Sequence, residues 1–399
     1  MKTYHITTCI TLLSLLATGA RAQEEIDEVL RRVEQNNKTL VASRELLKAE
    51  RVEARAGNYL ANPTADVEKL WTRKNDAGYE LTIKQSIDFP AAYGQRNVLA
   101  RLRENTAGYR HQAARQQILL EARQTCIEII YLRALQTLLD ERLQNAERLA
   151  GAYRKKLEQG SANRLELNKI LLETLDAREQ ARDNRSALDA ARERLRALNG
   201  GIPVAFEQET FPVVREIPSL EQLQERYLAT DPSIGELAGQ EEIALQEVKL
   251  NRALSLPKFD LGYKRAGGGS ASTSNGIVVG VSIPLFENRN KVKAARARAS
   301  LATAVSEEAR LDLRVSLKRL RDRLLSLDAA RKDYVVVLSD LRGKELLDKA
   351  LDAGQISVIE YFVELTTLHD GRRRQLEIER EYHDVLARLL RLSYPTPRD

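Results

Sequence analysis

Short segments in which every second residue is apolar occur four times along the chain. In one of them Leu81, Ile83 and Ile87 share one side, and the residues between them are polar or charged. A period of two predicts a β-strand with one apolar and one polar face. At about 10 residues each, the segments have the length of tilted strands that cross a bilayer. The strands predicted in this way span about 64–74, 79–89, 257–266 and 276–286.

Long stretches of helical periodicity separate the two pairs of strands. Leu313, Leu320 and Leu327 recur every seven residues, and Leu317 and Leu324 fill the alternate row. This is the spacing of a coiled-coil seam, in which one stripe of a helix packs against a partner helix. The pattern therefore predicts antiparallel helical hairpins. Their long helices span about 92–159, 161–199, 288–353 and 356–392.

The same order of elements occurs twice. Residues 37–63 realign on residues 231–257 at an offset of 194, and the same offset superimposes Gly160 on Gly354. One offset held across separated blocks indicates a tandem duplication. The predicted organisation is a signal peptide at 1–22, a first repeat at 23–200, a linker at 201–218, a second repeat at 219–393 and a tail at 394–399.

The N-terminus resembles an export signal. Lys2 precedes an apolar run at 6–20, and Ala20-Arg21-Ala22 has the small-x-small form of a cleavage site. A short membrane anchor is the alternative interpretation of this run. We expect the mature chain to begin at Gln23 and to be exported.

Composition agrees with long helices and excludes several other classes. Of 399 residues only 5% are aromatic, and charged residues make up 30%. The net charge of +6 is spread over mixed acids and bases, so no nucleic-acid partner is expected. None of the four histidines pairs with Cys or Glu at metal-ligand spacing, and the glycines at 267–269 precede a strand instead of a helix. We therefore expect no enzyme activity, no metal and no cofactor.

Four strands that cross a membrane present a problem of closure. An open sheet edge is not tolerated in lipid, and transmembrane barrels begin at about eight strands. Two or three chains must therefore contribute to one barrel. The alternative, ordinary half-buried hairpins on a soluble core, lacks an apolar layer elsewhere in the chain to cover the strands.

These features together resemble the TolC-type outer-membrane factors (outer membrane efflux proteins) of Gram-negative bacteria. The resemblance covers about 24–393. It rests on the exported start, the twofold repeat, the Gly-containing helical turns, the starts Asn37–Leu40 and Asp231–Ile234, the strand entries at Pro63 and Pro257, and the motif Ile283-Pro284-Leu285-Phe286. The segment Ile87–Pro90 followed by Gly94-Gln95-Arg96 is similar to the cation-efflux, CzcC-like branch.

The resemblance implies a mixed α/β membrane protein. Long helical hairpins would form a trimeric α-barrel in the periplasm, and four strands per chain would enter a shared twelve-stranded β-barrel in the outer membrane. It also implies a homotrimer that conducts solutes passively in a tripartite efflux system, with a periplasmic adaptor, an inner-membrane pump reached through the adaptor, and outer-membrane lipid as partners. A type I protein secretion channel is an alternative, as is a periplasmic coiled-coil scaffold without a pore.

Three groups of candidate residues follow. Glu166 and Glu360 lie where the family places acids near the periplasmic aperture, where rings of three carboxylates would favour cations. The alternative for both is a helix N-terminal acid stabilised by the helix dipole. The candidate membrane-interface aromatics are Trp71, Tyr79 and Tyr263. The candidate adaptor contacts at the helical tips are Gly160, Ser161, Ala162, Asn163, Arg164, Leu165, Gly354, Gln355, Ile356, Ser357, Val358 and Ile359.

Overall fold

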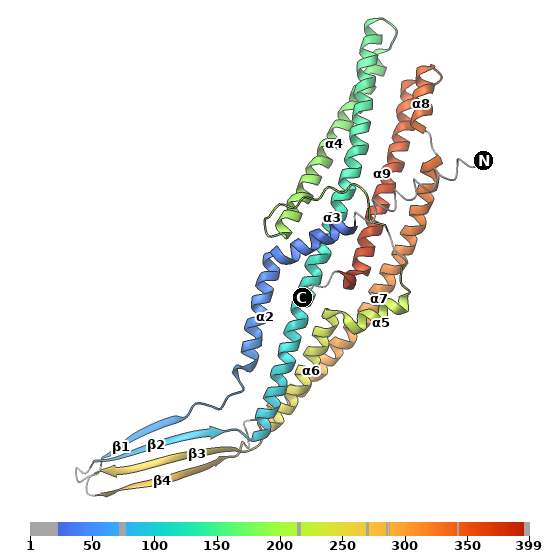
Figure 1. Ribbon diagram of the computed structural model, residues 1–399. Helices are drawn as coiled ribbons and strands as arrows, with labels where there is room; N and C mark the ends of the chain where they lie inside the picture. Colours follow the sequence, from blue (N-terminus) through green and yellow to red (C-terminus); the bar gives the residue numbers. More distant parts are fainter. Residues whose placement is uncertain are drawn as a thin grey trace. The chain divides into compact units, whose positions relative to one another are not determined.

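A computed structural model describes residues 23–71, 77–213, 217–268, 271–284, 286, 288–340 and 343–394 (Figure 1). The signal sequence predicted at 1–22, the outer parts of the predicted strand tips and nearly all of the C-terminal tail lie outside these residues. A helical segment at 23–36 comes first. The other helices are α2 (Lys38–Ala56), α3 (Pro90–Glu158), α4 (Arg164–Leu198), α5 (Leu220–Thr230), α6 (Pro232–Ala253), α7 (Arg289–Asp340), α8 (Gly343–Asp352), α9 (Val358–Leu389) and a 3-10 turn at Arg391–Ser393.

The four strands are β1 (Thr64–Trp71), β2 (Ala77–Ile87), β3 (Lys258–Gly268) and β4 (Ala271–Ser282). They form one antiparallel sheet in the order β1-β2-β3-β4, so the hairpins of the two repeats pair with each other through β2 and β3. The helix predicted at 288–353 corresponds to α7 and α8, and residues 341–342 between them lie outside the described part of the chain.

The chain divides into two compact units that do not coincide with the two repeats. One unit combines residues 1–41, 114–227 and 314–399, and the other combines residues 42–113 and 228–313. Each unit therefore contains matching parts of both repeats. The sheet and the helical segments next to it belong to the second unit, and both helical tips belong to the first.

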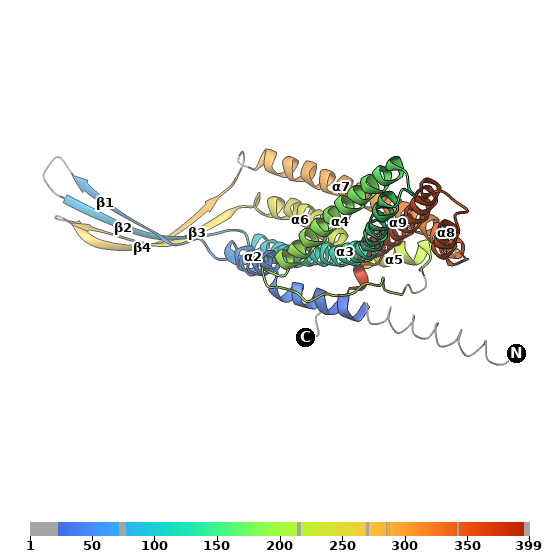
Figure 2. The same ribbon diagram turned by 90° about the horizontal axis from the view of Figure 1, so that it is seen from above.

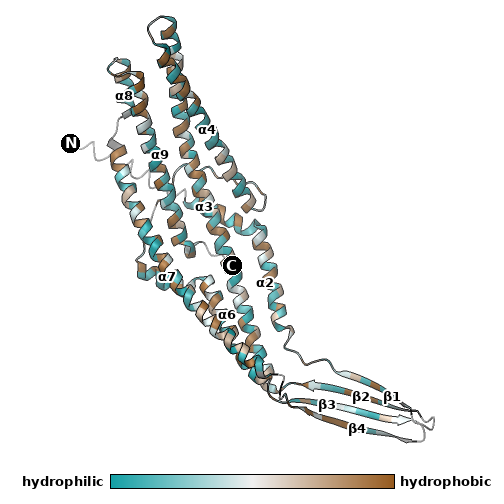
Figure 3. Ribbon diagram, turned by 180° about the vertical axis from the view of Figure 1, so that it is seen from behind, coloured by the Kyte–Doolittle hydropathy of each residue, from teal (hydrophilic) through white to brown (hydrophobic). Residues whose placement is uncertain are grey.

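The core of the first unit follows the heptad seam. Leu317, Leu324 and Leu327 of α7 are all buried, as the seven-residue spacing predicts. The main cluster joins the segment at 23–36 to α3 and α4, with Ile26, Ile130 and Leu195 among its buried side chains. Figure 3 shows the consequence in colour, since apolar and polar residues alternate around each long helix.

In the second unit, two glycines let α6 approach α3 closely. A Cβ atom on Gly239 would lie 2.3 Å from Oγ1 of Thr106, and one on Gly235 would lie 2.8 Å from the Tyr109 ring. Because real Cβ atoms do not approach other atoms so closely, any side chain at Gly239 would force the helices apart. Farther along, Val248 of α6 packs on small residues of α7.

Candidate functional site

The sheet has one apolar face, and that face is the more exposed one. In β4 the outward residues Ile277 and Val279 are 85% and 68% exposed, and Val67 of β1 is 74% exposed. The cross-strand register places these residues on the same side as Leu81 of β2 and Leu261 of β3. The alternation predicted from the sequence is thereby confirmed. Because burial of apolar surface drives folding, such a face requires an apolar neighbour, and the described part of the chain does not supply one.

No helix of the same unit lies over either face of the sheet within the described residues (Figures 1 and 2). The strand order also leaves β1 and β4 each with a single partner. Each edge therefore presents backbone N–H and C=O groups that a further strand could pair with.

The opposite face of the sheet is polar and carries charges of both signs. Lys264 of β3 forms an ion pair with Glu80 of β2 across the strands, and Lys258 lies 3.7 Å from Asp88 beyond the end of β2. Asp88 also receives a hydrogen bond from Arg96 at 2.5 Å. The paired charges and glycines on this face are typical of a surface in contact with water.

The two helical tips have the same geometry in both repeats. Gly160 and Gly354 adopt φ values of +71° and +66°, a left-handed conformation that glycine adopts without steric cost. After each glycine, a backbone N–H bonds back to the end of the preceding helix, at 2.8 Å from Ser161 to Lys156 and from Gln355 to Ala350. The predicted tip residues lie in the turns 160–163 and 354–357 and at the first helical positions after them.

Glu166 and Glu360 both complete a capping box. The Glu166 carboxylate accepts a hydrogen bond from the backbone N–H of Asn163 at 3.1 Å, and Glu360 does so from Ser357 at 2.7 Å. In return, the Ser357 hydroxyl accepts from the backbone N–H of Glu360. These hydrogen bonds hold the pKa of Glu360 below its ordinary value. The lowered pKa favours the charged form of Glu360, and the local contacts of both acids match those of helix N-terminal acids.

Behind the tips, a buried polar network ties the two hairpins together. The Tyr361 hydroxyl of α9 donates to Asp348 of α8 at 2.7 Å and accepts from the Asn145 amide of α3 at 2.9 Å. Burial raises the pKa of Tyr361 to about 12, so the hydroxyl keeps the proton that it donates. Around this network Ile170, Val358 and Phe362 form an apolar cluster. The sequence pattern contains no signal for this network, because its members come from three separate helices.

Two of the grooves on the helices differ in chemistry. The first, of about 710 Å³, lies among α7, α8 and α9, and its lining is mainly apolar, including Val337, Leu346 and Leu368. Leu346 and Val337 are both more than half exposed. Like the apolar face of the sheet, this groove is an apolar surface that the described part of the chain does not cover.

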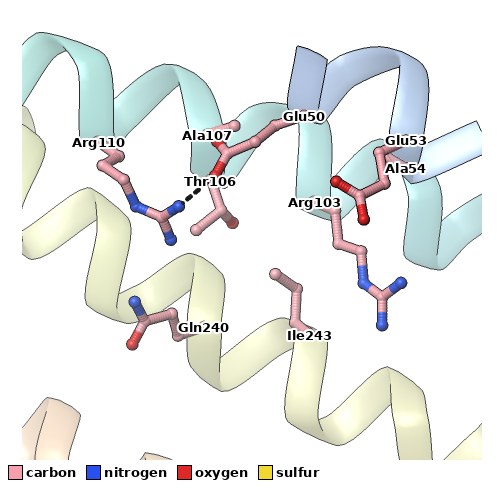
Figure 4. Close-up of a pocket in the computed structure, with 9 residues that line it drawn as sticks. All are labelled: Glu50, Glu53, Ala54, Arg103, Thr106, Ala107, Arg110, Gln240 and Ile243. Atoms are coloured by element: carbon pink, nitrogen blue, oxygen red, sulfur yellow. Dashed lines mark hydrogen bonds and ion pairs between the residues drawn. The ribbon is translucent and has the colours of Figure 1, made fainter. Parts of the chain in front are cut away.

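The second groove, of about 280 Å³, lies between α2, α3 and α6 in the unit that holds the sheet (Figure 4). Its two arginines pair with carboxylates. Arg110 binds Glu50 at 2.6 Å and Glu236 at 3.0 Å, and Arg103 lies 3.1 Å from Glu247. Both arginines of this groove are thus engaged by carboxylates, so we assign these ion pairs a structural role.

Other chemistry is sparse in the described part of the chain. No group of three or more His, Cys, Asp or Glu residues there could hold a metal ion. Of the histidines, His111 bonds to Ser43 at 2.9 Å, and burial lowers the pKa of His369 to about 4 and that of His383 to about 3. Burial also raises the pKa of the Cys126 thiol to about 12. None of the described helices has the length and apolarity needed to pass through a membrane.

The three predicted aromatic residues share one face of the sheet. Trp71 is 76% exposed, and Tyr79 and Tyr263 are each about two-fifths exposed on the same apolar side. The Tyr263 hydroxyl donates to Asn275 of β4 at 2.7 Å. Sequence reasoning missed the cations Lys69 and Arg265 on the described part of this face, although the strand alternation contains the signal for both.

The fold matches solved structures of outer-membrane channels over nearly the whole chain. CusC, described through its folding and transmembrane channel formation, is 16% identical with a TM-score of 0.79, covering 92% of this chain and 91% of CusC. The CmeC outer membrane channel of Campylobacter jejuni is 15% identical with a TM-score of 0.74, covering 94% and 87%. The outer membrane protein VceC of Vibrio cholerae is 14% identical with a TM-score of 0.76, covering 93% and 97%.

At these identities the comparison establishes the fold. Long helices with one four-stranded antiparallel sheet per chain match these channel structures, and the resemblance to TolC-type channels predicted from the sequence is confirmed at this level. No protein-family model and no curated protein matches the sequence.

Proposed function

We propose that this chain is one subunit of a trimeric outer-membrane channel that conducts solutes passively in a tripartite efflux system. The observation that carries the proposal is the sheet with an exposed apolar face, a polar opposite face and two open edges. In water such a face would drive aggregation, whereas in a bilayer it meets hydrocarbon. The structural similarity to CusC, CmeC and VceC supports the same function.

The assembly follows from the sheet edges. In lipid, unpaired backbone groups at β1 and β4 cost several kcal/mol each, so the edges of different copies must pair. Three copies would close a barrel of twelve strands, with the apolar face outward and the polar face lining the conduit. The apolar groove among α7, α8 and α9 gives a second reason for assembly, because it too lacks a partner in one chain.

The mechanism requires no reaction at this chain. Solutes would pass from an inner-membrane pump and a periplasmic adaptor into the helical tunnel, and then through the barrel. The long helical hairpins would lie in the periplasm, in a Gram-negative outer-membrane protein. The two tips would contact the adaptor, since both end in exposed, preformed turns of the same geometry. Glu166 and Glu360 would each form a ring of three carboxylates at the periplasmic aperture, favouring cations.

A direct test combines assembly and conductance. The full chain extracted from outer membranes in detergent should migrate as a trimer that dissociates on heating, and it should form discrete channels in planar bilayers. A water-soluble protein that gives no conductance would instead favour the periplasmic scaffold. A protein secretion channel would give the same results in both assays. It would be distinguished by a polypeptide that is normally exported and that accumulates inside cells lacking this chain.

A further inference from the structure

Within the described strands, two cations interrupt the apolar face of the sheet. Lys69 lies between Val67 and Trp71 on β1, and Arg265 lies between Tyr263 and Gly267 on β3. Because side chains alternate along a strand, both cations project to the apolar side. The cross-strand register puts Arg265 level with Val67, and Lys69 one row nearer the hairpin tips. Both side chains are exposed.

Neither cation faces a carboxylate on this side of the sheet within the described strands. The four strand acids, Asp66, Glu68, Glu80 and Asp260, all occupy the alternate positions and so project to the polar face. There Glu80 holds Lys264 in an ion pair. Lys264 and Arg265 are neighbours in sequence, but among the described residues only Lys264 has a carboxylate as counter-ion.

The residues around the two cations are typical of a membrane–water interface. The Lys69 ammonium lies 5.6 Å from the centre of the Trp71 ring. The Tyr263 hydroxyl leans toward the tips to reach Asn275, which pairs with Arg265. Rings with one polar end, such as Trp and Tyr, are enriched at the headgroup level of membranes. The cross-strand rows that lie nearer the helices than Arg265 are apolar on this face, with Gln85 as the exception. The Gln85 amide donates hydrogen bonds to the carbonyls of Ala61 and Ser86.

The distance that the apolar rows span agrees with a position of the two cations at the membrane interface. From Ile283 to Asn275 there are eight residues, or about 26 Å of extended chain. A tilt of about 40° reduces this to about 20 Å of depth, against an apolar band of about 25 Å in transmembrane barrels. The long stems of Lys69 and Arg265 would extend the remaining few ångström and leave the charges among the headgroups.

We propose that Lys69 and Arg265 bind the phosphate groups of anionic lipids in the leaflet on the tip side of the sheet. Phosphate is the headgroup chemistry that Arg and Lys recognise best, and a lipid phosphate supplies a counter-ion that the described strands do not offer on this face. The proposal rests on the proposed function, because it requires the sheet to lie in a bilayer.

The chain contains a local reporter for the test. Trp71 is the only tryptophan of the 399 residues and lies beside Lys69. The full chain is reconstituted into vesicles in which brominated phosphatidylglycerol or brominated phosphatidylcholine replaces part of the lipid. Bromine quenches tryptophan only on contact, so the two quenching curves give the relative association constant of the anionic lipid at this site.

In the unsubstituted chain, phosphatidylglycerol should be preferred over phosphatidylcholine by about fivefold for each cation, and less at high salt. Lys69→Gln should remove most of the preference measured at Trp71. Arg265→Gln should reduce it less, because β3 lies two strands, or about 10 Å, away from β1. The matched control is Lys264→Gln, next to Arg265 on the opposite face, which should leave the preference unchanged.

Other results would overturn the proposal. Equal quenching by both lipids in the unsubstituted chain would contradict the phosphate contact and leave membrane insertion intact. An equal loss of preference in Lys264→Gln would mean that overall charge, and not this site, selects the lipid. Absence of quenching by either lipid would contradict the insertion of the sheet, and with it the proposed function. A further measurement adds inorganic phosphate to the vesicles. If the preference for phosphatidylglycerol at Trp71 is unchanged, the site binds lipid and not the free anion. If the preference is lost, the site is not specific for lipid and the proposal is overturned.

Discussion

At the residue scale, the same acidic position at each tip has two candidate roles. Glu166 and Glu360 hold the first turn of the helix that follows by accepting a backbone N–H, which is a structural task. The same carboxylates would line the aperture in the assembled channel. A glutamine at this position can also accept the backbone N–H, so the two roles can be separated by substitution.

We therefore predict different results for two substitutions of Glu360. Glu360→Gln keeps the capping box and removes the charge, so it should lower the cation-to-anion permeability ratio without changing the folded tip. Glu360→Ala removes both and should also loosen the start of α9. Reversal potentials in a salt gradient measure the first effect, and proteolysis at the tip measures the second.

The control for this prediction is Glu345→Gln, an exposed acid on α8 away from the tips. It should leave selectivity unchanged. If Glu360→Gln and a double Glu166→Gln, Glu360→Gln variant both keep the original cation preference, the carboxylate rings do not select ions and the capping role is sufficient.

At the element scale, helix packing depends on a few small residues. Gly239→Ala should separate α6 from α3, because the added Cβ would lie 2.3 Å from the Thr106 hydroxyl, which is held by a 2.8 Å hydrogen bond to Leu102. The cost of such overpacking is about 1–3 kcal/mol. Gly108→Ala, also in the second unit, meets nothing within 4 Å and should raise stability by about 0.5–1 kcal/mol. Denaturant unfolding in detergent measures both, and equal effects would disprove the packing argument.

The sheet allows a second matched pair, on adjacent residues with opposite orientation. Val279 pairs with Leu261 in the middle of the apolar face, whereas Val278 pairs with Gly262 on the polar face. Val279→Arg should weaken insertion by about 2–4 kcal/mol, the cost of a cation near the bilayer midplane. Val278→Arg should be tolerated. The measurement is urea-dependent folding into vesicles, and similar losses for both variants would reverse or remove the assigned faces.

At the scale of the whole molecule, the two repeats do not fold as two domains. Each compact unit takes matching segments from both repeats, and β2 of the first repeat pairs with β3 of the second. The duplication therefore produces two similar halves within each unit. Among the described residues, the uncovered surfaces include the apolar sheet face, the edges β1 and β4, and the groove among α7, α8 and α9. The proposed assembly of identical chains in a membrane would cover all three.

The proposed assembly also predicts where a periplasmic adaptor would bind. Ser161→Cys and Gln355→Cys should each form crosslinks to the periplasmic adaptor produced with this chain, because both positions lie in the exposed turns. Cys126 is buried with a raised pKa, so its thiol should not compete. Glu179→Cys, at an exposed position in the middle of α4, is the control and should not crosslink. Failure at both tips would contradict the docking surface.

Much of this arrangement could be predicted from local patterns. Strand alternation placed Leu81 and Val279 on one face, and heptad spacing marked Leu317 and Leu324 as buried, because both depend only on the geometry of the nearby backbone. The turns at Gly160 and Gly354 follow from glycine before a capping sequence. The network around Tyr361 could not be predicted, because its partners Asn145 and Asp348 lie on other helices.

The sequence by itself determined the repeat, the long helices, the four amphipathic strands and the two capped tips, since each is a periodicity or a short motif. Only the tertiary structure decided that the two hairpins join through β2 and β3, that the compact units mix the repeats, and which face of the sheet is exposed. The physical reason is the distance along the chain over which each feature is decided. Periodicity states which residues share a face, whereas the partner of that face depends on contacts between segments far apart in the chain.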